Sequence, residues 1–378
     1  MNRVIIDLEA LQHNLMTVNG WIQKHGSFLT MVTKVLCGHP DTLKALQVLG
    51  VRSMGDSRLA NFKAVDRIFP EFEAWYLRLP HMSIIEEVVS LTDVSLNSET
   101  ETIERLNDEA GKQDKRHKII VMIELGDLRE GILPGSLIEF YNKIFEMPHI
   151  YIQGIGANLG CIGGIAPSID QLMQLVLYKE LLELKFDKNL PFISAGSSNL
   201  LPLLLEGKVP KEINHFRIGE AIFLGTDLVN GGTLHGLRDN AIMLEAEIVE
   251  IKEKSLIPIG DTTSMTPFDT VDDDDVTYGD RGYRAIVTVG QLDTEVTGLT
   301  PLKPNYTIAG ASSDLAVVNV GKESEGLSIG DSIKFRVNYA AMLRLMSSNY
   351  IEKVVAPSID EFSNGIKDDD RLENNENL

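Results

Sequence analysis

The stretch Phe28-Leu29-Thr30-Met31-Val32-Thr33-Lys34 is a short apolar, β-rich run, and the amphipathic segment 41–49 separates it from the next such run at 51–55. This strand–helix–strand pattern repeats. Further apolar runs lie at 74–79, 93–96, 119–125, 150–159, 192–195 and 213–217, with helical patterns at 57–68, 84–90, 99–111, 137–145, 169–184 and 199–205. Eight strands alternating with helices predict a parallel (β/α)₈, TIM-like barrel. A doubly wound open sheet with fewer strands is the alternative.

The residues before and after this repeat have different patterns. Leucine, valine and isoleucine recur at steps of three and four over 8–22, which predicts an amphipathic helix with Asp7 as its N-cap. After about residue 235 helical periodicity ends, and short β-type runs interrupted by Gly and Pro predict a mostly antiparallel β domain. We therefore expect a barrel domain at 1–235, a C-terminal β domain at 236–356 and an acidic, disordered tail at 357–378.

The composition limits the partners and the location. Among 378 residues, 35 are Lys or Arg and 55 are Asp or Glu, so the formal net charge is −20. Such a charge repels nucleic acid and anionic membrane surfaces, and no apolar run approaches the length of a membrane span. Cys37 and Cys161 are far apart in sequence, which excludes a disulfide framework and favours a reducing, cytoplasmic location. No His/Cys spacing typical of a metal site occurs.

Lys34 ends the first predicted strand, at the end of the barrel where active sites lie. Desolvation there lowers the pKa of a lysine and makes its amine nucleophilic towards carbonyl groups; a lysine that extends to solvent at the rim is the alternative. Ser and Gly at 194–199 and 217–221 follow the last two predicted strands, where barrels commonly bind phosphate, although such residues also form ordinary tight turns. A lysine opposite a phosphate site predicts pyridoxal 5′-phosphate as the ligand.

Three segments carry a more specific signal: Ile6-Asp7-Leu8-Glu9-Ala10-Leu11-Gln12-His13-Asn14-Leu15, Val32-Thr33-Lys34-Val35-Leu36-Cys37-Gly38-His39, and Arg217-Ile218-Gly219-Glu220-Ala221. They resemble segments of the alanine-racemase-type pyridoxal phosphate enzymes, and are most similar to the alanine/ornithine racemase branch. The resemblance extends to about Tyr350. It implies a barrel followed by a β domain, and an amino-acid racemase with pyridoxal phosphate as its cofactor.

The resemblance implies roles for residues at the strand ends. Lys34 would bond to the cofactor and act as one of two bases at the substrate α-carbon. Arg217 would face the pyridine nitrogen and keep it unprotonated, which favours racemisation over side reactions. Ser198 and the backbone amides of Gly219 and Glu220 would hold the phosphate.

Other positions are matched in the same way. Arg129 would contact the substrate carboxylate and the cofactor hydroxyl, and Asn158 takes the position where alanine racemases of the family stack a histidine on the ring. Tyr350 resembles a late tyrosine near the phosphate. Ser313 and Asp314 match a loop that the second subunit places at the site entrance.

The second base of the family is a tyrosine from the β domain of the partner subunit. Within Tyr278-Gly279-Asp280-Arg281-Gly282-Tyr283-Arg284, the spacing to the arginine selects Tyr278, with Tyr283 as its competitor. The resemblance therefore implies a homodimer with shared active sites.

Departures from the family pattern bear on the substrate. Gly38 and His39 stand where the family has a phosphate-binding tyrosine, and Met122 stands where alanine racemases often have a modified lysine. Together with Asn158, they weaken the case for strict alanine specificity, so we expect a racemase that prefers ornithine or a similar larger amino acid. Three alternatives stay open. They are alanine racemase proper, a decarboxylase (disfavoured because both cysteines lie in the barrel), and a non-catalytic pyridoxal phosphate-binding protein (disfavoured by the β domain).

Overall fold

The computed structural model describes residues 2–68, 71–160, 162–257, 259–260 and 279–366. The chain divides into two compact units. The barrel unit contains residues 12–237 and the segment that begins at Ile359, and the β unit contains the chain up to Leu11 and residues 238–358.

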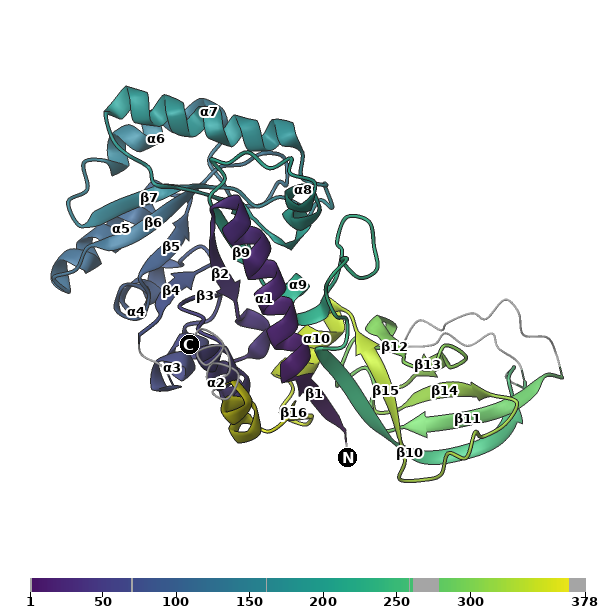
Figure 1. Cartoon of the computed structure of the whole chain (residues 1–378). Helices are drawn as coiled ribbons and strands as arrows, with labels where there is room; N and C mark the ends of the chain where they lie inside the picture. The colour runs from purple at the N-terminus through teal and green to yellow at the C-terminus, as the bar shows by residue number, and fades with distance from the viewer. Residues whose placement is uncertain (1, 69–70, 161, 258, 261–278, 367–378) are drawn as a thin grey trace, which may run out of the picture. The chain divides into compact units, whose positions relative to one another are not determined.

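Eight parallel strands close into a barrel in the first unit (Figure 1). They follow each other in chain order, and the last strand pairs with the first, where Thr30 lies opposite Arg217. The predicted barrel is therefore confirmed. Its strands are β2 (Phe28–Val32), β3 (Ser53–Asp56), β4 (Glu73–Tyr76), β5 (Val94–Asn97), β6 (His117–Met122), β7 (Ile150–Gly156), β8 (Phe192–Gly196) and β9 (His215–Ile218).

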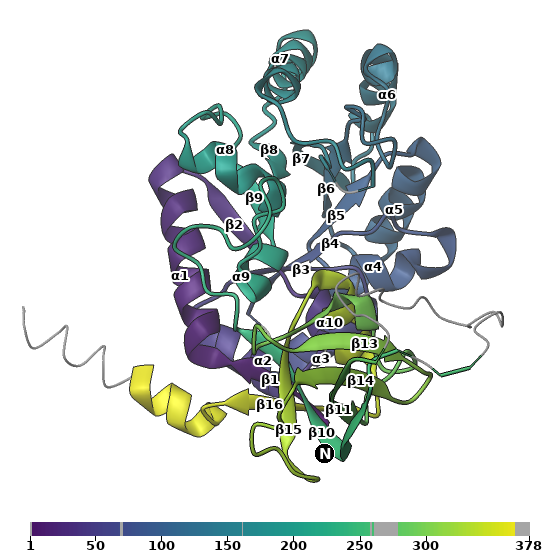
Figure 2. The same ribbon diagram turned by 90° about the vertical axis from the view of Figure 1, so that its right-hand side faces the viewer.

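Helices connect these strands and surround the barrel (Figure 2). They are α1 (Leu8–His25), α2 (Pro40–Val48), α3 (Leu59–Ile68), α4 (Ile85–Leu91), α5 (Thr100–Lys112), α6 (Leu137–Ile144), α7 (Ile169–Phe186), α8 (Leu201–Leu205) and α9 (Glu220–Leu224). Short 3₁₀ turns are η1 (Lys34–Leu36), η2 (Met82–Ile84), η3 (Pro134–Ser136) and η4 (Ser198–Leu200). A cluster of buried side chains packs within the unit, made of Trp75, Val94, Leu96, Ile120 and Met122. Part of the barrel is thus a packed core, which fixes the strand ends that carry the site.

The β unit is built on a mostly antiparallel sheet of order β12-β15-β10-β11-β14-β13. Strand β10 shows why: its residues from Ile242 to Ile248 alternate between buried and partly exposed, the pattern of a strand with one covered face. The elements are β10 (Ile242–Ser255), β11 (Arg281–Val287), η5 (Val296–Gly298), β12 (Leu299–Pro301), β13 (Thr307–Ala311), β14 (Ala316–Gly321), β15 (Ser332–Val337), α10 (Tyr339–Ser347) and β16 (Glu352–Ala356). The predicted β domain is confirmed.

Three local expectations differ from the structure. The first residues form strand β1 (Arg3–Asp7), which pairs with β10 and β16 in the β unit, because Val4 and Ile6 are buried there. Helix α10 interrupts the β domain, and Asn338 caps it by accepting a hydrogen bond from the Ala341 amide at 2.9 Å. Residues 359–366 are helical rather than disordered, and burial of Phe362 explains their order. Residues 367–378 lie outside the described residues.

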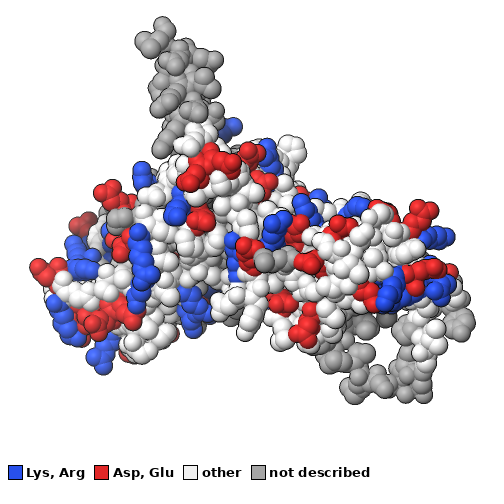
Figure 3. Space-filling model, turned by 90° about the horizontal axis from the view of Figure 1, so that it is seen from below, with Lys and Arg blue, Asp and Glu red and all other residues white. Residues whose placement is uncertain are grey.

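Two searches of the described residues bear on partners. No described helix is long and apolar enough to cross a membrane. No group of three or more His, Cys, Asp or Glu side chains in the same residues could hold a metal ion. On the face shown in Figure 3, acidic and basic side chains are interspersed among the described residues rather than gathered into one basic stripe.

Candidate active site

Lys34 lies directly beyond β2, at the carboxyl end of the barrel. It is half-buried and opens the turn η1, which Cys37 closes in a left-handed conformation with φ of 50° by donating its N–H to the Lys34 carbonyl at 3.4 Å. The preceding Thr33 hydroxyl donates to Asp56 Oδ2 at 3.4 Å. The lysine is therefore presented from a turn that is held at both ends.

Asp56 at the end of β3 is a residue that the sequence analysis missed. It is almost fully buried and accepts hydrogen bonds from the Ser57 amide at 2.7 Å, the Arg58 amide at 2.9 Å and the Asn61 side chain at 3.1 Å. Burial raises the pKa of this carboxyl group to about 6, although these donors oppose the rise. An acidic residue at the end of a predicted barrel strand was the available signal.

Arg217 lies on β9, the strand beside β2, and its guanidinium group is buried. It donates to the Ser194 carbonyl at 2.6 Å, the Ser194 hydroxyl, the Ala157 carbonyl at 3.2 Å and Asn158 Oδ1 at 2.9 Å. Burial lowers the pKa of Arg217 to about 10, against the raising effect of Glu130. The group therefore stays cationic at neutral pH, in a fixed orientation.

Glu130 joins three of the predicted site residues, and the sequence analysis missed it. Its Oε2 pairs with Arg129 Nε at 2.6 Å, and its Oε1 accepts a hydrogen bond from the Asn158 side chain. Asn158 in turn accepts from Arg217 at 2.9 Å. One carboxylate thus connects Arg129, Asn158 and Arg217 into a continuous polar network.

Two more carboxylates hold the loop that carries Arg129. Glu124 accepts the amides of Leu128 and Arg129, each at 3.1 Å. Asp127 Oδ1 accepts the amide of Ile162 at 3.3 Å. Both side chains therefore bind backbone amides and orient the loop.

The predicted phosphate segment brings small residues and hydroxyl groups together. Ser198 Oγ accepts the Ala221 amide at 3.2 Å, which joins the loops after β8 and β9. A Cβ atom on Gly219 would lie 3.0 Å from the carbonyl oxygen of Val32, so the chain packs closely there. The buried Ser197 hydroxyl has no hydrogen-bond partner among the described residues. An unsatisfied hydroxyl in such a cradle fits an anionic ligand.

Glu220 and Lys34 interact electrostatically across this cradle. Burial raises the pKa of Glu220 to about 7, and the positive charge of Lys34 opposes the rise. The lysine therefore lies within electrostatic range of the segment that was predicted to bind phosphate.

The remaining candidates lie in the β unit, which is described by itself. Ser313 and Asp314 form the turn between β13 and β14, where the Ser313 hydroxyl donates to Asp314 Oδ2 at 2.7 Å. Tyr350 is 91% exposed, and Tyr283 on β11 is half-buried. Tyr278 lies outside the described residues. The roles of these five residues stay predictions.

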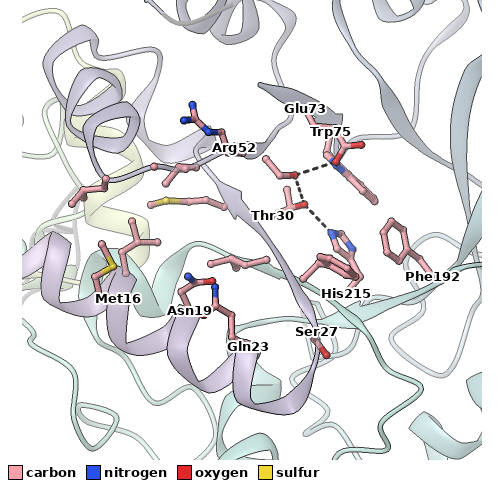
Figure 4. A pocket seen from close by; sticks show the side chains of 18 residues that line it. Met16, Asn19, Gln23, Ser27, Thr30, Arg52, Glu73, Trp75, Phe192 and His215 are labelled. Carbon is pink, nitrogen blue, oxygen red and sulfur yellow. Dashed lines mark hydrogen bonds between the residues drawn. The ribbon is translucent and has the colours of Figure 1, made fainter. Parts of the chain in front are cut away.

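A cavity of about 440 Å³ lies at the other end of the barrel, where the strands begin (Figure 4). Its polar side chains bond to one another: Thr30 Oγ1 lies 2.7 Å from Ser53 Oγ, and the Trp75 indole donates to Glu73 at 2.7 Å. Its His215 is buried, which lowers the pKa of this imidazole well below its usual value. No residue predicted for the site lines this cavity.

Known proteins are similar to this chain over most of its length. A family model described as alanine racemase, N-terminal domain, matches residues 6–227. An ornithine racemase from Acetoanaerobium sticklandii is 34% identical over 358 residues, 93% of this chain and 98% of that protein. A lysine racemase from Thermotoga maritima is 35% identical over 360 residues, 94% of this chain and 99% of that protein.

Solved structures show the same fold at lower identity. An alanine racemase from Bartonella henselae with covalently bound pyridoxal phosphate has a TM-score of 0.71 and 16% identity, and the match covers 94% of this chain and 99% of that one. An alanine racemase from Streptomyces lavendulae has a TM-score of 0.71 and 15% identity, with 96% and 98% covered. At this identity the likeness concerns the fold alone.

Proposed function

Because this chain belongs to the family described as alanine racemase, N-terminal domain, we propose that it is a pyridoxal phosphate-dependent racemase acting on ornithine, lysine or a similar larger amino acid. The observation that carries the proposal is the meeting of Lys34, the Ser198 cradle and the buried Arg217 at the ends of neighbouring strands. This cofactor needs from a protein an amine, a phosphate site and a partner for its ring nitrogen, and an arginine can be that partner.

The residues present fit the cofactor. Ser197, Ser198 and the Gly219 backbone supply small, hydrogen-bonding groups for a phosphate, and the unsatisfied Ser197 hydroxyl is a donor without a partner among the described residues. Lys34 would hold the cofactor covalently, and Arg217 would face its ring. When bound, pyridoxal phosphate withdraws electrons from the substrate α-carbon and so acidifies the proton there.

Three side chains of this protein have separate roles in the proposed reaction. The Lys34 amine takes or returns the proton on one face of the substrate α-carbon. Arg217 donates hydrogen bonds but keeps its protons, because its pKa of about 10 leaves it charged at neutral pH. Arg129, oriented by Glu124 and Glu130, offers a cation to the substrate carboxylate.

A second base must act on the opposite face for the configuration to invert. We assign it to Tyr278 of a partner subunit, so the working unit is a homodimer with shared sites. Mixing a Lys34→Ala protein with a Tyr278→Phe protein tests both points. Mixed dimers contain one intact site each, so activity should return to about a quarter of the wild-type value on random exchange. No recovery after demonstrated subunit exchange would contradict the shared site.

The substrate proposal rests on the two curated relatives and on the departures from the alanine racemase pattern. Both relatives are named for diamino acids, and the match to each covers more than nine-tenths of this chain. Met122, fully buried in the barrel core, supplies no charge in this region. We therefore expect ornithine or lysine to be preferred over alanine.

The direct test is exchange of the α-proton in deuterated buffer. The holoenzyme is incubated separately with L-ornithine, L-lysine, L-alanine, L-serine and L-glutamate, followed by chiral analysis. We expect deuterium incorporation with inversion, with kcat/KM highest for ornithine or lysine. A clear preference for alanine would overturn the substrate proposal.

A lysine variant tests the catalytic proposal itself. Replacing Lys34 by Ala should lower the rate by roughly 10³-fold or more, because both the covalent anchor and one base are lost. Lys44→Ala is the matched control, since Lys44 pairs with Asp41 at 3.3 Å on the exposed side of α2. Full turnover by the Lys34 variant would contradict a catalytic role for Lys34.

A cytoplasmic location is part of the proposal. It rests on the composition, with two cysteines separated by more than a hundred positions. Cell fractionation against a periplasmic marker tests it, and co-fractionation with that marker would contradict it.

A further inference from the structure

Helix α7 carries an apolar stripe on its solvent side. Five large apolar side chains recur at steps of four, four, four and three, and each is between 41% and 86% exposed. They are Ile169, Met173, Leu177, Leu181 and Leu184. From Ile169 to Leu184 the stripe extends over about 22 Å along the helix. Exposed apolar rows of this length mark interaction surfaces in globular proteins.

The opposite side of α7 is also apolar. Leu172, Leu175, Val176 and Leu182 are buried. The ion pair between Lys179 and Glu183, at 2.8 Å, lies on this partly buried side rather than at the surface. Helices that are apolar on both sides are normally covered on both sides. In Figures 1 and 2, α7 runs along the outside of the barrel beside α6, and Phe186 contacts Phe145, directly after α6, with tilted rings whose centroids are 5.0 Å apart.

Two charges near the ends of α7 suit a second copy of the same helix. Asp170 lies in the first turn and Lys185 in the last, and both are exposed. Neither forms an ion pair within the described part of the chain. At about 100° per residue, both fall on the same flank of the stripe. Two antiparallel copies about a two-fold axis would bring Asp170 of each against Lys185 of the other, with Leu177 near the axis.

We propose that the outer face of α7 is a self-association surface, on which a second copy of this chain docks its own α7 in antiparallel orientation. None of the residues proposed for the shared sites lies on α7, so a contact through α7 would join two of the proposed homodimers into a four-chain assembly.

Leu177→Lys tests the surface. The mass of the holoenzyme is measured by sedimentation at several concentrations, for the wild type, Leu177→Lys and Leu205→Lys. Leu205, also an exposed leucine on a barrel helix, is the matched control. We expect the Leu177 variant to have half the assembly mass of the other two, with kcat/KM within about two-fold of wild type because α7 is not part of the site. Equal masses for all three proteins would overturn the proposal. If the protein does not form the proposed shared-site dimer, the α7 contact alone would make a dimer, and Leu177→Lys would then reduce the assembly from two chains to one.

Charge reversal tests the antiparallel arrangement. Asp170→Lys and Lys185→Asp are each expected to raise the dissociation constant of the α7 contact by about ten-fold or more, because like charges then meet twice across the axis. The double reversal should restore it to within about three-fold, since each pair is re-formed with opposite sign. If the double variant has as high a dissociation constant as the single variants, the antiparallel pairing of Asp170 with Lys185 is wrong.

Discussion

The two ends of the barrel differ in how their buried polar groups are satisfied. At the amino end, Thr30, Ser53, Glu73 and Trp75 bond to one another around a cavity. At the carboxyl end, buried atoms such as Ser197 Oγ and Asn97 Oδ1 have no partner among the described residues. Unsatisfied buried groups cost free energy unless a ligand or water bonds to them. The unsatisfied groups at the carboxyl end therefore fit the proposed ligand site, whereas these four side chains at the amino end satisfy one another.

One imidazole links the two ends. His215 Nδ1 lies 2.7 Å from Ser194 Oγ, which bonds to Arg217, and its Nε2 lies 2.8 Å from Thr30 Oγ1. The ring is stacked on Trp75 at 4.2 Å between centroids. Because burial depresses its pKa, His215 is neutral and joins the ends by hydrogen bonds rather than by charge.

After the loss expected for Lys34→Ala, the largest effect is expected at Arg217. Arg217→Ala should lower kcat/KM by about 10²–10³-fold, roughly 3–4 kcal/mol, because a fixed cation is lost and the oxygens of Asn158 and Ser194 lose their donor. The control is Arg116→Ala at the amino end, where Arg116 lies over the Tyr151 ring at 5.3 Å. Equal losses of kcat/KM in both variants would contradict a functional difference between the two ends of the barrel.

Asp56 should give the carboxyl end a pH-dependent stability. Its folded pKa of about 6 lies above its unfolded value, so its contribution is present at low pH and is lost as the pH rises towards 6 and beyond. The free energy of unfolding of the wild type relative to Asp56→Asn should fall by about 2 kcal/mol between pH 4 and pH 7. Denaturant titrations across this range measure it. Parallel pH curves for the two proteins would show that Asp56 titrates normally.

Glu130 should affect substrate binding more than turnover. Glu130→Gln keeps the shape but removes the charge that orients Arg129, so we expect kcat/KM to fall by about ten-fold, near 1.4 kcal/mol, mainly through KM. Glu139→Gln is the control, because Glu139 pairs with Lys143 at 3.2 Å on the exposed side of α6. A fall confined to kcat would place Glu130 in the chemical step instead.

The smallest effect is expected at the amino end. Ser53→Ala removes the hydrogen bond to Thr30 and should cost about 1 kcal/mol of stability while leaving kcat/KM within about two-fold of wild type. Thermal unfolding and initial rates measure both. A large loss of activity with unchanged stability would mean that the hydrogen bonds through His215 couple the amino end of the barrel to the position of Arg217.

Much of the fold follows from local pattern. The eight strands and the helices between them were predictable because a buried parallel strand and an amphipathic helix each have their own periodicity. Strand β1 was hidden, since Arg3–Asp7 reads as the lead-in to helix α1 and its pairing with β10 spans more than two hundred residues. Helix α10 was hidden by its β-rich surroundings, although Asn338 is a typical N-cap.

The residues of the candidate site also fall into those that the sequence predicted and those that it did not. Lys34 and Arg217 were found because each stands beside a predicted strand end and belongs to a segment that resembles a known family. Glu130 and Asp56 were missed because single acidic residues near strand ends are usually solvated, and their contacts with Asn158 and Thr33 join positions 28 and 23 apart.

By itself, the sequence determined the order of the barrel strands, the β domain and the lysine at the first strand end, since these depend on residues that are close along the chain. Only the tertiary structure decided which side chains meet at the strand ends, which carboxylates are buried, and that α7 turns a second apolar face outward. Those outcomes depend on burial and on pairing between distant segments, and a local pattern contains neither.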